Sequence, residues 1–391
     1  MRTNSNDYVI RVLGAPGEAD ARAWNDLLAM QEEPTPFMRH EYLRALHESK
    51  SAVPRAGWTP RFITLWRDAE LHAACALYLK AHSYGEYVFD WAWAGAYEQH
   101  GLAYYPKAVV AVPFTPVPGS RLLAKNADAR RALVQAMLDW CREHGLSSLH
   151  ILFPTDEDAH ACDEAGMMLR HNVQFHWTNA AWPDFDAFLA SLSHDKRKKI
   201  RQERRKVHDA GVTFRWSRGV DITPADWDFF YRCYERTYRE HGNAPYLTRD
   251  FFRQLAHDMP RMWLLFIAER DGKPLASSLI AIEERDGAKI AYGRYWGALE
   301  RVDCLHFEAC YYQPLAWCIQ QGFDRFEGGA QGEHKMARAL MPVRTSSAHW
   351  LAHPAFADAV DKFLQREGRG IDNYLEHLEE RSPFRQPPTN G

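Results

Sequence analysis

The sequence predicts a mixed α/β (α+β) fold, built as two domains that each have a central mixed sheet flanked by helices. Three observations lead to this prediction. The chain has 391 residues, more than twice the length of a typical domain. One order of helices and strands occurs twice along it. Two short segments also recur, one at the end of a helix and one at the start of a strand.

The first half begins with two amphipathic helices and continues into strands. Apolar periodicity predicts helices at residues 21–30 and 40–49, then strands at 61–66, 71–79 and 86–93, with a turn at 67–70. A helix at 129–144 is expected to stop at Gly145, a natural C-terminal residue. A strand at 149–153, a short helix at 156–165 and an extended run to Trp177 complete this half.

The second half repeats this order. Helices are expected at 225–240 and 249–257, because Pro224 and Thr248 suit helix starts. The strands that follow are expected at 262–268, 275–282 and 289–296, with a turn at 270–273. A helix at 307–321 should stop at Gly322, and a further strand should begin at 324–327.

Two local matches support a duplication. Trp140-Cys-Arg-Glu-His-Gly145 parallels Trp317-Cys-Ile-Gln-Gln-Gly322, and the strand near Arg61 parallels the strand near Arg261. The first pair is offset by 177 residues and the second by 200, so we place an insertion in the first copy at 96–119. The predicted domains are 1–180 and 181–391; the second begins with a basic helix, and C-terminal helices are expected to pack back on the first.

Composition excludes several classes of protein. The 48 Lys and Arg nearly balance the 51 Asp and Glu, for a net charge of -3, which argues against a nucleic-acid coat or an acidic disordered tail. The seven cysteines form no C-x-x-C pair, so we expect reduced thiols and no metal site. No apolar run approaches the roughly 20 residues of a membrane span. A soluble, cytoplasmic protein of unknown oligomeric state is expected.

Three segments carry residues suited to chemistry. The first, residues 89–107, is rich in aromatic rings with charged residues among them, which suits a concave binding site; a segment that merely covers the sheet is the alternative. Its candidate substrate-binding residues are Asp90, Trp93, Tyr97, His100, Tyr105 and Lys107. The strand expected at 108–114 leads through Gly119 to Arg121 and a helix. Such a start can hold phosphate, although an ordinary turn explains it equally.

The second segment, residues 194–208, has eight Lys or Arg against two acids. Its local charge of +6 leaves the rest of the chain at -9. A sparse apolar seam predicts a helix with one packed stripe. We interpret the charge as a site for donor phosphates, those of coenzyme A or tRNA, against the alternative of a solvated face. The candidate phosphate-binding residues are Lys196, Arg197, Lys199 and Arg201.

The third segment joins a helix start at Glu308 to a strand end at Glu327. Three glycines follow within five positions, interleaved with and followed by polar residues: Gln331, Glu333, His334 and Lys335. Glycines let the backbone approach a ligand, and the acid, amide, imidazole and ammonium groups suit proton transfer and oxyanion stabilisation. The alternative is a polar turn, with Glu308 favoured by the helix dipole. No G-x-S-x-G, Walker, H-E-x-x-H or G-x-G-x-x-G motif is present.

At these residues the sequence resembles the FemAB-like N-acyltransferases. The resemblance lies in Asp90-Trp-Ala-Trp-Ala, in Tyr104-Tyr-Pro-Lys with the residues up to Val117, in Pro245-Tyr-Leu-Thr-Arg249 and in Gly328-Gly-Ala-Gln-Gly-Glu-His-Lys335. It implies two tandem domains of the GNAT acetyltransferase superfamily. The segment Gly293-Arg294-Tyr-Trp-Gly, with His306-Phe-Glu308 and Glu327, is similar to the core of leucyl/phenylalanyl-tRNA–protein transferases.

The second resemblance implies that Glu308 and Glu327 serve the acceptor amine, with Gln331 near the position of that family's glutamine and Arg294 in the substrate site. The usual acetyl-CoA pyrophosphate loop is absent from both halves. We therefore expect an N-acyltransferase that moves an acyl or aminoacyl group from acyl-CoA or aminoacyl-tRNA to a small-molecule or peptide amine. Glu308 and Glu327 would deprotonate the amine, His334 is the next choice of base, and the loop from Gln331 to Lys335 would bind the oxyanion.

Two alternatives remain open. One is Fem-type aminoacyl transfer from tRNA to a peptidoglycan precursor, which would depend on the basic helix. The other is a binding module for peptide or cell-wall fragments without catalysis, for which the missing pyrophosphate loop is the main support.

Overall fold

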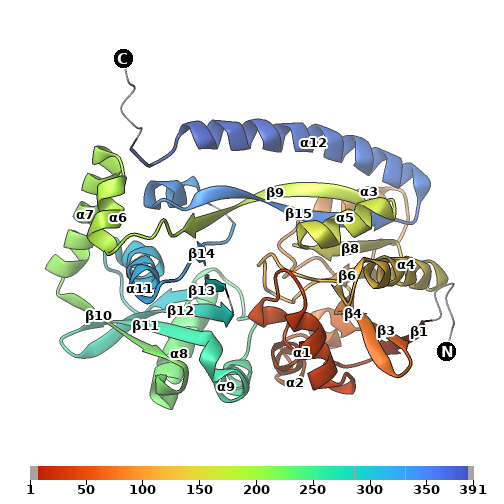
Figure 1. Cartoon of the computed structure of the whole chain (residues 1–391), viewed down its shortest axis with the longest axis horizontal. Helices are drawn as coiled ribbons and strands as arrows, with labels where there is room; N and C mark the ends of the chain where they lie inside the picture. The colour runs from red at the N-terminus through yellow and green to blue at the C-terminus, as the bar shows by residue number, and fades with distance from the viewer. Residues whose placement is uncertain (1–7, 286, 331, 386–391) are drawn as a thin grey trace. The chain divides into compact units, whose positions relative to one another are not determined.

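The computed structural model describes residues 8–285, 287–330 and 332–385. The chain folds as two compact units (Figure 1). Unit 1 comprises residues 1–172 and 344–373, and unit 2 comprises residues 173–343 and 374–391. The first break lies close to the predicted division at residue 180, and residues 344–373 belong with the N-terminal part of the chain.

Unit 1 contains two sheets and the helices that cover them. Its strands are β1 (Val9–Leu13), β2 (Trp58–Pro60), β3 (Phe62–Arg67), β4 (Glu70–Cys75), β5 (Leu77–Lys80), β6 (Lys107–Val110), β7 (Leu123–Ala124) and β8 (Ser148–Leu152). They form the orders β1-β3-β4-β7 and β8-β6-β5-β2, and the part of β15 (Met341–Leu351) from residue 344 adds to β8. The helices are α1 (Ala21–Ala29), α2 (His40–Glu48), α3 (Trp91–Gln99), α4 (Ala127–Glu143), α5 (Asp156–Glu164) and the first part of α12 (Pro354–Glu380).

Unit 2 has one sheet of order β10-β11-β12-β13-β14-β9. Its strands are β10 (Val212–Arg218), β11 (Trp263–Arg270), β12 (Lys273–Arg285), β13 (Ala288–Ala298), β14 (Arg325–Glu327) and β9 (Met168–Thr178), of which β9 belongs to unit 2 from residue 173. The helices are α6 (Phe185–Ser191), α7 (His194–Asp209), α8 (Pro224–Glu240), α9 (Arg249–Asp258), α10 (Leu305–Phe307) and α11 (Gln313–Gln321).

Each unit contains the same strand–helix–strand crossover between parallel strands. In unit 1, β6 pairs in parallel with β8, and α4 lies between them in the chain. In unit 2, β13 pairs in parallel with β14, and α11 lies between them. The two recurring segments, ending at Gly145 and Gly322, occupy the ends of these crossover helices. The sequence match therefore falls at topologically equivalent positions.

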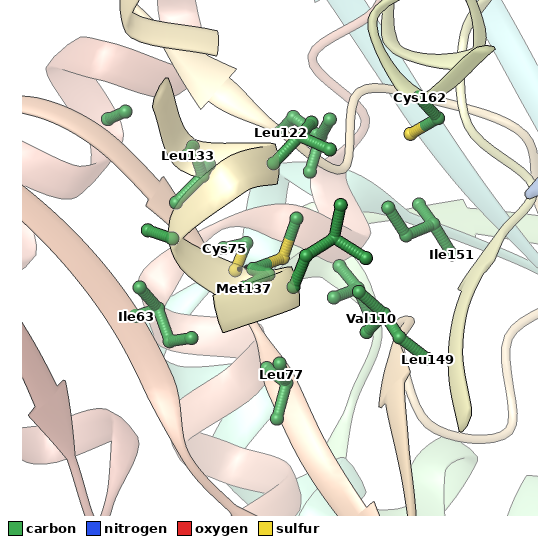
Figure 2. Packing of buried hydrophobic residues seen from close by; sticks show 14 of the residues in the cluster. Ile63, Cys75, Leu77, Val110, Leu122, Leu133, Met137, Leu149, Ile151 and Cys162 are labelled. Carbon is green, nitrogen blue, oxygen red and sulfur yellow. Dashed lines mark hydrogen bonds between the residues drawn. The ribbon is translucent and has the colours of Figure 1, made fainter. Parts of the chain in front are cut away.

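The core of unit 1 shows why its crossover helix is amphipathic. Met137 and Leu133 of α4 pack against Ile63, Cys75 and other side chains of β3, β4, β6 and β8 (Figure 2). Each buried aliphatic side chain of this kind contributes about 1.5–3 kcal/mol. The predicted helix at 129–144 is thus α4, stopped at Gly145 with φ 61°.

Four predicted elements differ from the structure. Residues 86–90 are an irregular loop that leads into α3, and no strand forms at 86–93. The strand expected at 71–79 is two strands, β4 and β5, that pair with different partners. The strand expected at 108–114 ends at Val110. The helix expected at 307–321 is interrupted by a π-helical turn, Glu308–Tyr312 (η6), because Pro314 lacks the N–H that a regular helix requires. Within the described ranges, no helix is both long and apolar enough to cross a bilayer.

Candidate active site

The predicted basic helix is α7, and its two faces differ sharply in charge. Ile200, Glu203 and Val207 are buried on one face, with Ile200 in the main core of unit 2. Seven cations on the remaining surface form no ion pair within the part of the chain that the structure describes: Lys196, Arg197, Lys198, Lys199, Arg201, Arg205 and Lys206. Such a concentration of unneutralised cations favours a polyanionic ligand.

The inward side of α7 contacts the predicted catalytic segment. Arg204 donates from Nε to both carboxylate oxygens of Glu308 at 3.2 Å, and its Nη2 lies 3.1 Å from Oε1. Gln313 donates a second hydrogen bond to Glu308 Oε1 at 2.7 Å. Glu308 is the first residue of the π-helical turn and is only 4% exposed. Both of its oxygens are therefore engaged by unit 2 itself.

A second buried ion pair joins α7 to the glycine-rich segment. Glu203 accepts hydrogen bonds from Arg338 at 2.8 Å and from the hydroxyl of Tyr312. Arg338 also donates to the backbone carbonyl of His334 at 2.7 Å, and its guanidinium lies 3.6 Å from the centre of the Phe307 ring. The fully buried Arg338 thus fixes both the position and the electrostatic surroundings of His334.

His334 is the exposed titratable group of this cluster. Its ring packs near Phe307 and Tyr311, with centroid separations of 5.8 and 6.2 Å. Partial burial lowers the pKa of His334, and the positive charge of Arg338 lowers it further. The imidazole is accordingly neutral at neutral pH and can accept a proton. The charge of Lys199 on α7 also lowers this pKa, and α7 contacts the turn Glu333–Arg338 that carries His334.

Lys335 is buried within the glycine-rich turn that the sequence predicts to bind the oxyanion. Its buried ammonium donates to the backbone carbonyls of Gly328, Gly329 and Ala330 at 2.7, 3.2 and 2.8 Å. Burial lowers the pKa of Lys335 to about 8. The side chain therefore holds the glycine-rich turn together from within. Gly328 is required there, because a Cβ would meet the Leu340 side chain at 2.3 Å and the Phe175 carbonyl at 3.1 Å.

Glu327 ends β14 and is paired within the sheet. Its Oε1 lies 3.0 Å from Arg325, and its Oε2 lies 3.8 Å from His176 on β9, the residue opposite it in the strand register. Burial, followed by the charges of Arg325 and Lys335, lowers the pKa of His176 to about 3. Glu327 and a neutral imidazole thus form a buried acid–histidine pair at the start of the glycine-rich turn.

The other predicted residues of unit 2 contact partners other than His334 or cannot be placed. Glu333 is exposed and accepts hydrogen bonds from Tyr374 and Arg381, both at 3.0 Å. Arg294 lies on β13 beside Tyr295, with a guanidinium-to-ring distance of 5.0 Å. Gln331 lies outside the residues that the structure describes.

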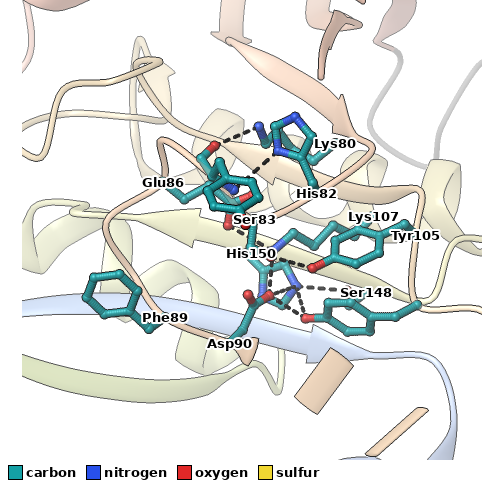
Figure 3. A network of polar contacts seen from close by, with 12 residues as sticks. Lys80, His82, Ser83, Glu86, Phe89, Asp90, Tyr105, Lys107, Ser148 and His150 are labelled. Atoms are coloured by element: carbon teal, nitrogen blue, oxygen red, sulfur yellow. Dashed lines mark hydrogen bonds and ion pairs between the residues drawn. The ribbon is translucent and has the colours of Figure 1, made fainter. Parts of the chain in front are cut away.

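Unit 1 gathers the predicted ring-rich residues around a buried ammonium group (Figure 3). Lys107 is fully buried and donates to Ser83 at 2.7 Å, to Glu86 at 2.8 Å and to Asp90. Burial raises the pKa of Glu86 to about 7 even though Lys107 opposes the shift. The charge of Lys107 keeps the pKa of Asp90 well below its usual range against the effect of burial. Tyr105 shares Ser83 through a 2.8 Å hydrogen bond.

The network continues through a pair of histidines. Tyr104 donates to Asp90 at 2.6 Å and lies 3.1 Å from His150 Nε2. His150 and His349 face one another across β8 and β15, with 2.7 Å between their Nδ1 atoms. Burial lowers the pKa of His150 to about 3, so this pair is neutral. It occupies the position in unit 1 that Glu327 and His176 occupy in unit 2.

The remaining predicted residues of unit 1 fall in three places. Trp93 is buried against His349, with ring centroids 5.0 Å apart. Tyr97 packs on Phe356 of α12, whereas His100 is exposed and lies 2.8 Å from the Ala96 carbonyl. Arg121 is 1% exposed and donates to the carbonyls of Leu152, Gly119 and Val117. These hydrogen bonds give Arg121 a structural role, and we do not include Arg121 in the proposed phosphate-binding site.

Sequence reasoning did not single out several residues of these clusters. Glu203 and Arg204 lay within the basic run, but their partners are more than a hundred residues away in the chain. Glu203 is an acid on the apolar seam of a basic helix. An acid at such a position indicates a buried partner, and this was the one sign in the sequence that could have identified Glu203. His150 and His349 carried no signal, because each is a single histidine in its strand and the two are 199 positions apart in the chain. No group of three or more potential metal-ligating side chains occurs among the described residues.

Comparison with known proteins connects these features to a family. The FemAB-like family model, described as peptidoglycan biosynthesis/recognition, matches residues 16–386. The crystal structure of FemX is 10% identical with a TM-score of 0.54, over 88% of this chain and 98% of FemX. L-PGS from Bacillus licheniformis is 11% identical with a TM-score of 0.53, over 88% and 97%. A tandem GNAT protein from the clavulanic acid biosynthesis pathway is 14% identical over 89% and 99%, with a TM-score of 0.44. Curated protein sequences give no match.

Proposed function

Because this chain belongs to the FemAB-like family, we propose that it is an N-acyltransferase whose transfer site lies in unit 2, between helix α7 and the turn that carries His334. The predicted mixed α/β fold is confirmed by the structural likeness to FemX and L-PGS. The single observation that carries the location is the contact of α7 with both predicted segments. Arg204 pairs with Glu308, Glu203 pairs with Arg338, and Lys199 lies near His334.

The donor is an acyl or aminoacyl co-substrate with phosphate groups, and α7 binds it. Seven cations of this helix that form no ion pair with any described residue supply attraction without sequence specificity, as a polyphosphate or tRNA backbone requires. Aminoacyl-tRNA fits a long basic helix better than coenzyme A does, because three phosphates would neutralise only part of this charge. The family description, peptidoglycan biosynthesis/recognition, supports a peptidoglycan precursor as the source of the acceptor amine.

In the reaction, the acceptor amine attacks the ester or thioester carbonyl carbon of the donor. His334 removes the proton that the amine loses, because its imidazole is exposed and neutral. The tetrahedral oxyanion forms beside the glycine-rich turn, where the buried ammonium of Lys335 places a positive charge. The intermediate then collapses, the bond from the carbonyl carbon to the tRNA ribose oxygen or the thiol sulfur breaks, and the protonated His334 returns its proton to that leaving atom.

In this proposal Glu308 and Glu327 do not deprotonate the amine, which differs from the sequence prediction. Both carboxylates are held by cations, Glu308 by Arg204 and Glu327 by Arg325. Both oxygens of the buried Glu308 already accept hydrogen bonds from Arg204 and Gln313, whereas the His334 imidazole is exposed. We propose that Glu308 positions Arg204 and therefore α7. His334 is the base that removes the proton from the amine.

The test is acceptor-dependent release of tRNA from aminoacyl-tRNA, and of free thiol from acyl-CoA, by the full-length protein. His334→Gln should lower turnover by about 10²-fold or more, the usual contribution of a general base. His257→Ala is the matched control, since His257 is an exposed histidine of the same unit and should leave turnover unchanged. Glu308→Gln keeps a hydrogen-bonding group opposite Arg204 and should lower turnover less than His334→Gln does.

Two results would contradict the assignment. If His334→Gln retains full turnover, the base is another group, with Glu308 and Glu327 next in order. If neither donor is consumed while ligands still raise the melting temperature, the protein is a binding module and not a transferase.

A further inference from the structure

The loop between β5 and α3 exposes aromatic side chains in an alternating pattern. We call residues 81–91 the aromatic loop. Tyr84, Tyr87, Phe89 and Trp91 are 59%, 39%, 59% and 42% exposed. The intervening Glu86, Val88 and Asp90 are buried, and Figure 3 shows Phe89 directed away from the polar network that Asp90 joins. Four large exposed rings within eight residues are an unusual surface for a soluble domain.

The surface of the aromatic loop carries no charge at neutral pH. The loop contains three ionisable residues other than tyrosine: His82, Glu86 and Asp90. Both carboxylates point inward to Lys107. Burial lowers the pKa of His82, and the charge of Lys80 lowers it further, so the imidazole is neutral. A phosphate or carboxylate ligand would therefore find no cation on this loop.

The backbone beneath the rings is held in a single conformation. Lys80 donates to the Tyr84 carbonyl at 3.1 Å, and Arg170 donates to the Phe89 carbonyl at 2.7 Å. Arg170 is itself held by Glu367 through two 2.8 Å hydrogen bonds. Tyr87 has a φ of 61°, a left-handed conformation that costs energy in a residue with a side chain. A loop that is both strained and braced presents its rings in a fixed arrangement.

Two of the rings form a corner. The centroids of Tyr84 and Trp91 lie 5.0 Å apart with an interplanar angle of 61°. Each ring combines an apolar face with one polar group, the phenol hydroxyl or the indole N–H. A ligand that suits this corner has flat apolar faces and hydroxyl groups at its edges. An acyl chain or an aliphatic side chain would cover these polar groups without pairing them.

We infer that the aromatic loop binds the sugar rings of an uncharged oligosaccharide, with a pyranose ring stacked against Tyr84 and Trp91. The C–H face of a pyranose is apolar and its equatorial hydroxyls lie at the rim, which matches the corner in both respects. The site lies in unit 1, outside the residues assigned to transfer. The inference does not depend on the proposed transfer reaction.

The experiment measures glycan binding without turnover, so its failure is distinct from failure of transfer. The full-length protein is titrated with the β-1,4-linked tetramer of N-acetylglucosamine and with maltotetraose, by calorimetry and saturation-transfer NMR. Trp91→Ala and Tyr84→Ala should each weaken binding by about 10-fold or more, as for an aromatic residue central to an interface. Trp216→Ala is the matched control, because Trp216 is 49% exposed and lies in unit 2.

Every outcome bears on the inference. Glycan binding that the two loop variants lose and Trp216→Ala retains would support it, provided that melting temperatures match that of the parent protein. Tyr84 and Phe89 are the most exposed rings of the aromatic loop. If Trp91→Ala does not fold, Tyr84→Ala therefore still tests the inference. Absence of binding to both glycans, or binding that both loop variants retain, would overturn it. Binding to phosphatidylcholine vesicles that Trp91→Ala abolishes would also overturn it, in favour of a membrane surface.

Discussion

Removal of three charges from α7 gives a prediction whose size follows from the structure. Lys198, Arg201 and Arg205 are exposed and recur at the helical spacing of three and four residues, so they lie on one face. Their replacement by glutamine lowers from seven to four the number of helix cations that have no ion-pair partner in the described part of the chain. Ile200 and Val207, which pack the helix on its unit, are untouched, so the fold should be retained.

The magnitude follows from counterion release. Each phosphate contact contributes about 0.7–0.9 to the slope of log K against log salt concentration. If all seven cations contact tRNA, a fourfold rise in salt weakens binding by about 10³-fold, whereas four cations give about 10²-fold. Fluorescence anisotropy of labelled tRNA, measured between about 50 and 200 mM salt, would determine the slope for the parent protein and the slope for the variant.

The matched control removes three arginines from α8 in the same unit. Arg236 and Arg239 are paired with Glu240 and Glu235, and Arg232 lies on the same helix. Their replacement by glutamine changes the net charge equally and should leave the slope close to that of the parent protein. Equal slopes for the parent and the α7 variant would refute the assignment of α7 as the donor-binding helix.

Two further predictions concern the buried networks. Lys107→Met leaves the carboxylates of Glu86 and Asp90 buried without their cation, which should cost about 3–5 kcal/mol in urea unfolding at pH 8. Without Lys107 both carboxylates bind protons more readily, so the deficit should shrink at pH 5; equal deficits would contradict this account. Arg338→Gln removes a charge that lowers the pKa of His334, so the acidic limb of the activity profile should move to higher pH, and Arg338→Lys should leave it nearly in place. A profile unchanged by Arg338→Gln would count against His334 as the base.

Local patterning was enough to predict most elements of the fold. Helices α4, α7, α8 and α9 carry apolar residues at a period near 3.6 and have defined ends, such as Thr223 and Thr248 at N-caps. These signals depend only on residues a few positions apart. The duplicated order, and the recurring segments that end at Gly145 and Gly322, were likewise visible because each repeat keeps its own local pattern.

The strand predicted at 86–93 shows where local patterning fails. Exposure does alternate along the loop, with Tyr87 and Phe89 outside and Glu86 and Asp90 inside. Two of the three inward residues, Glu86 and Asp90, are however acids that face Lys107, and only Val88 is apolar. The alternation is set by an ion-pair network and not by a β-ladder, and the sequence distinguishes the two only if the partner is known.

The amino-acid sequence by itself determined the fold class, the tandem organisation, the basic helix and the family resemblance, because each depends on residue types at short, regular spacing. Only the tertiary structure decided the partners of the charged groups. It paired Glu308 with Arg204, enclosed Lys335 in backbone carbonyls and left the His334 imidazole exposed. The physical reason is that a charged group's chemistry depends on its burial and its neighbours, and those neighbours come from distant parts of the chain.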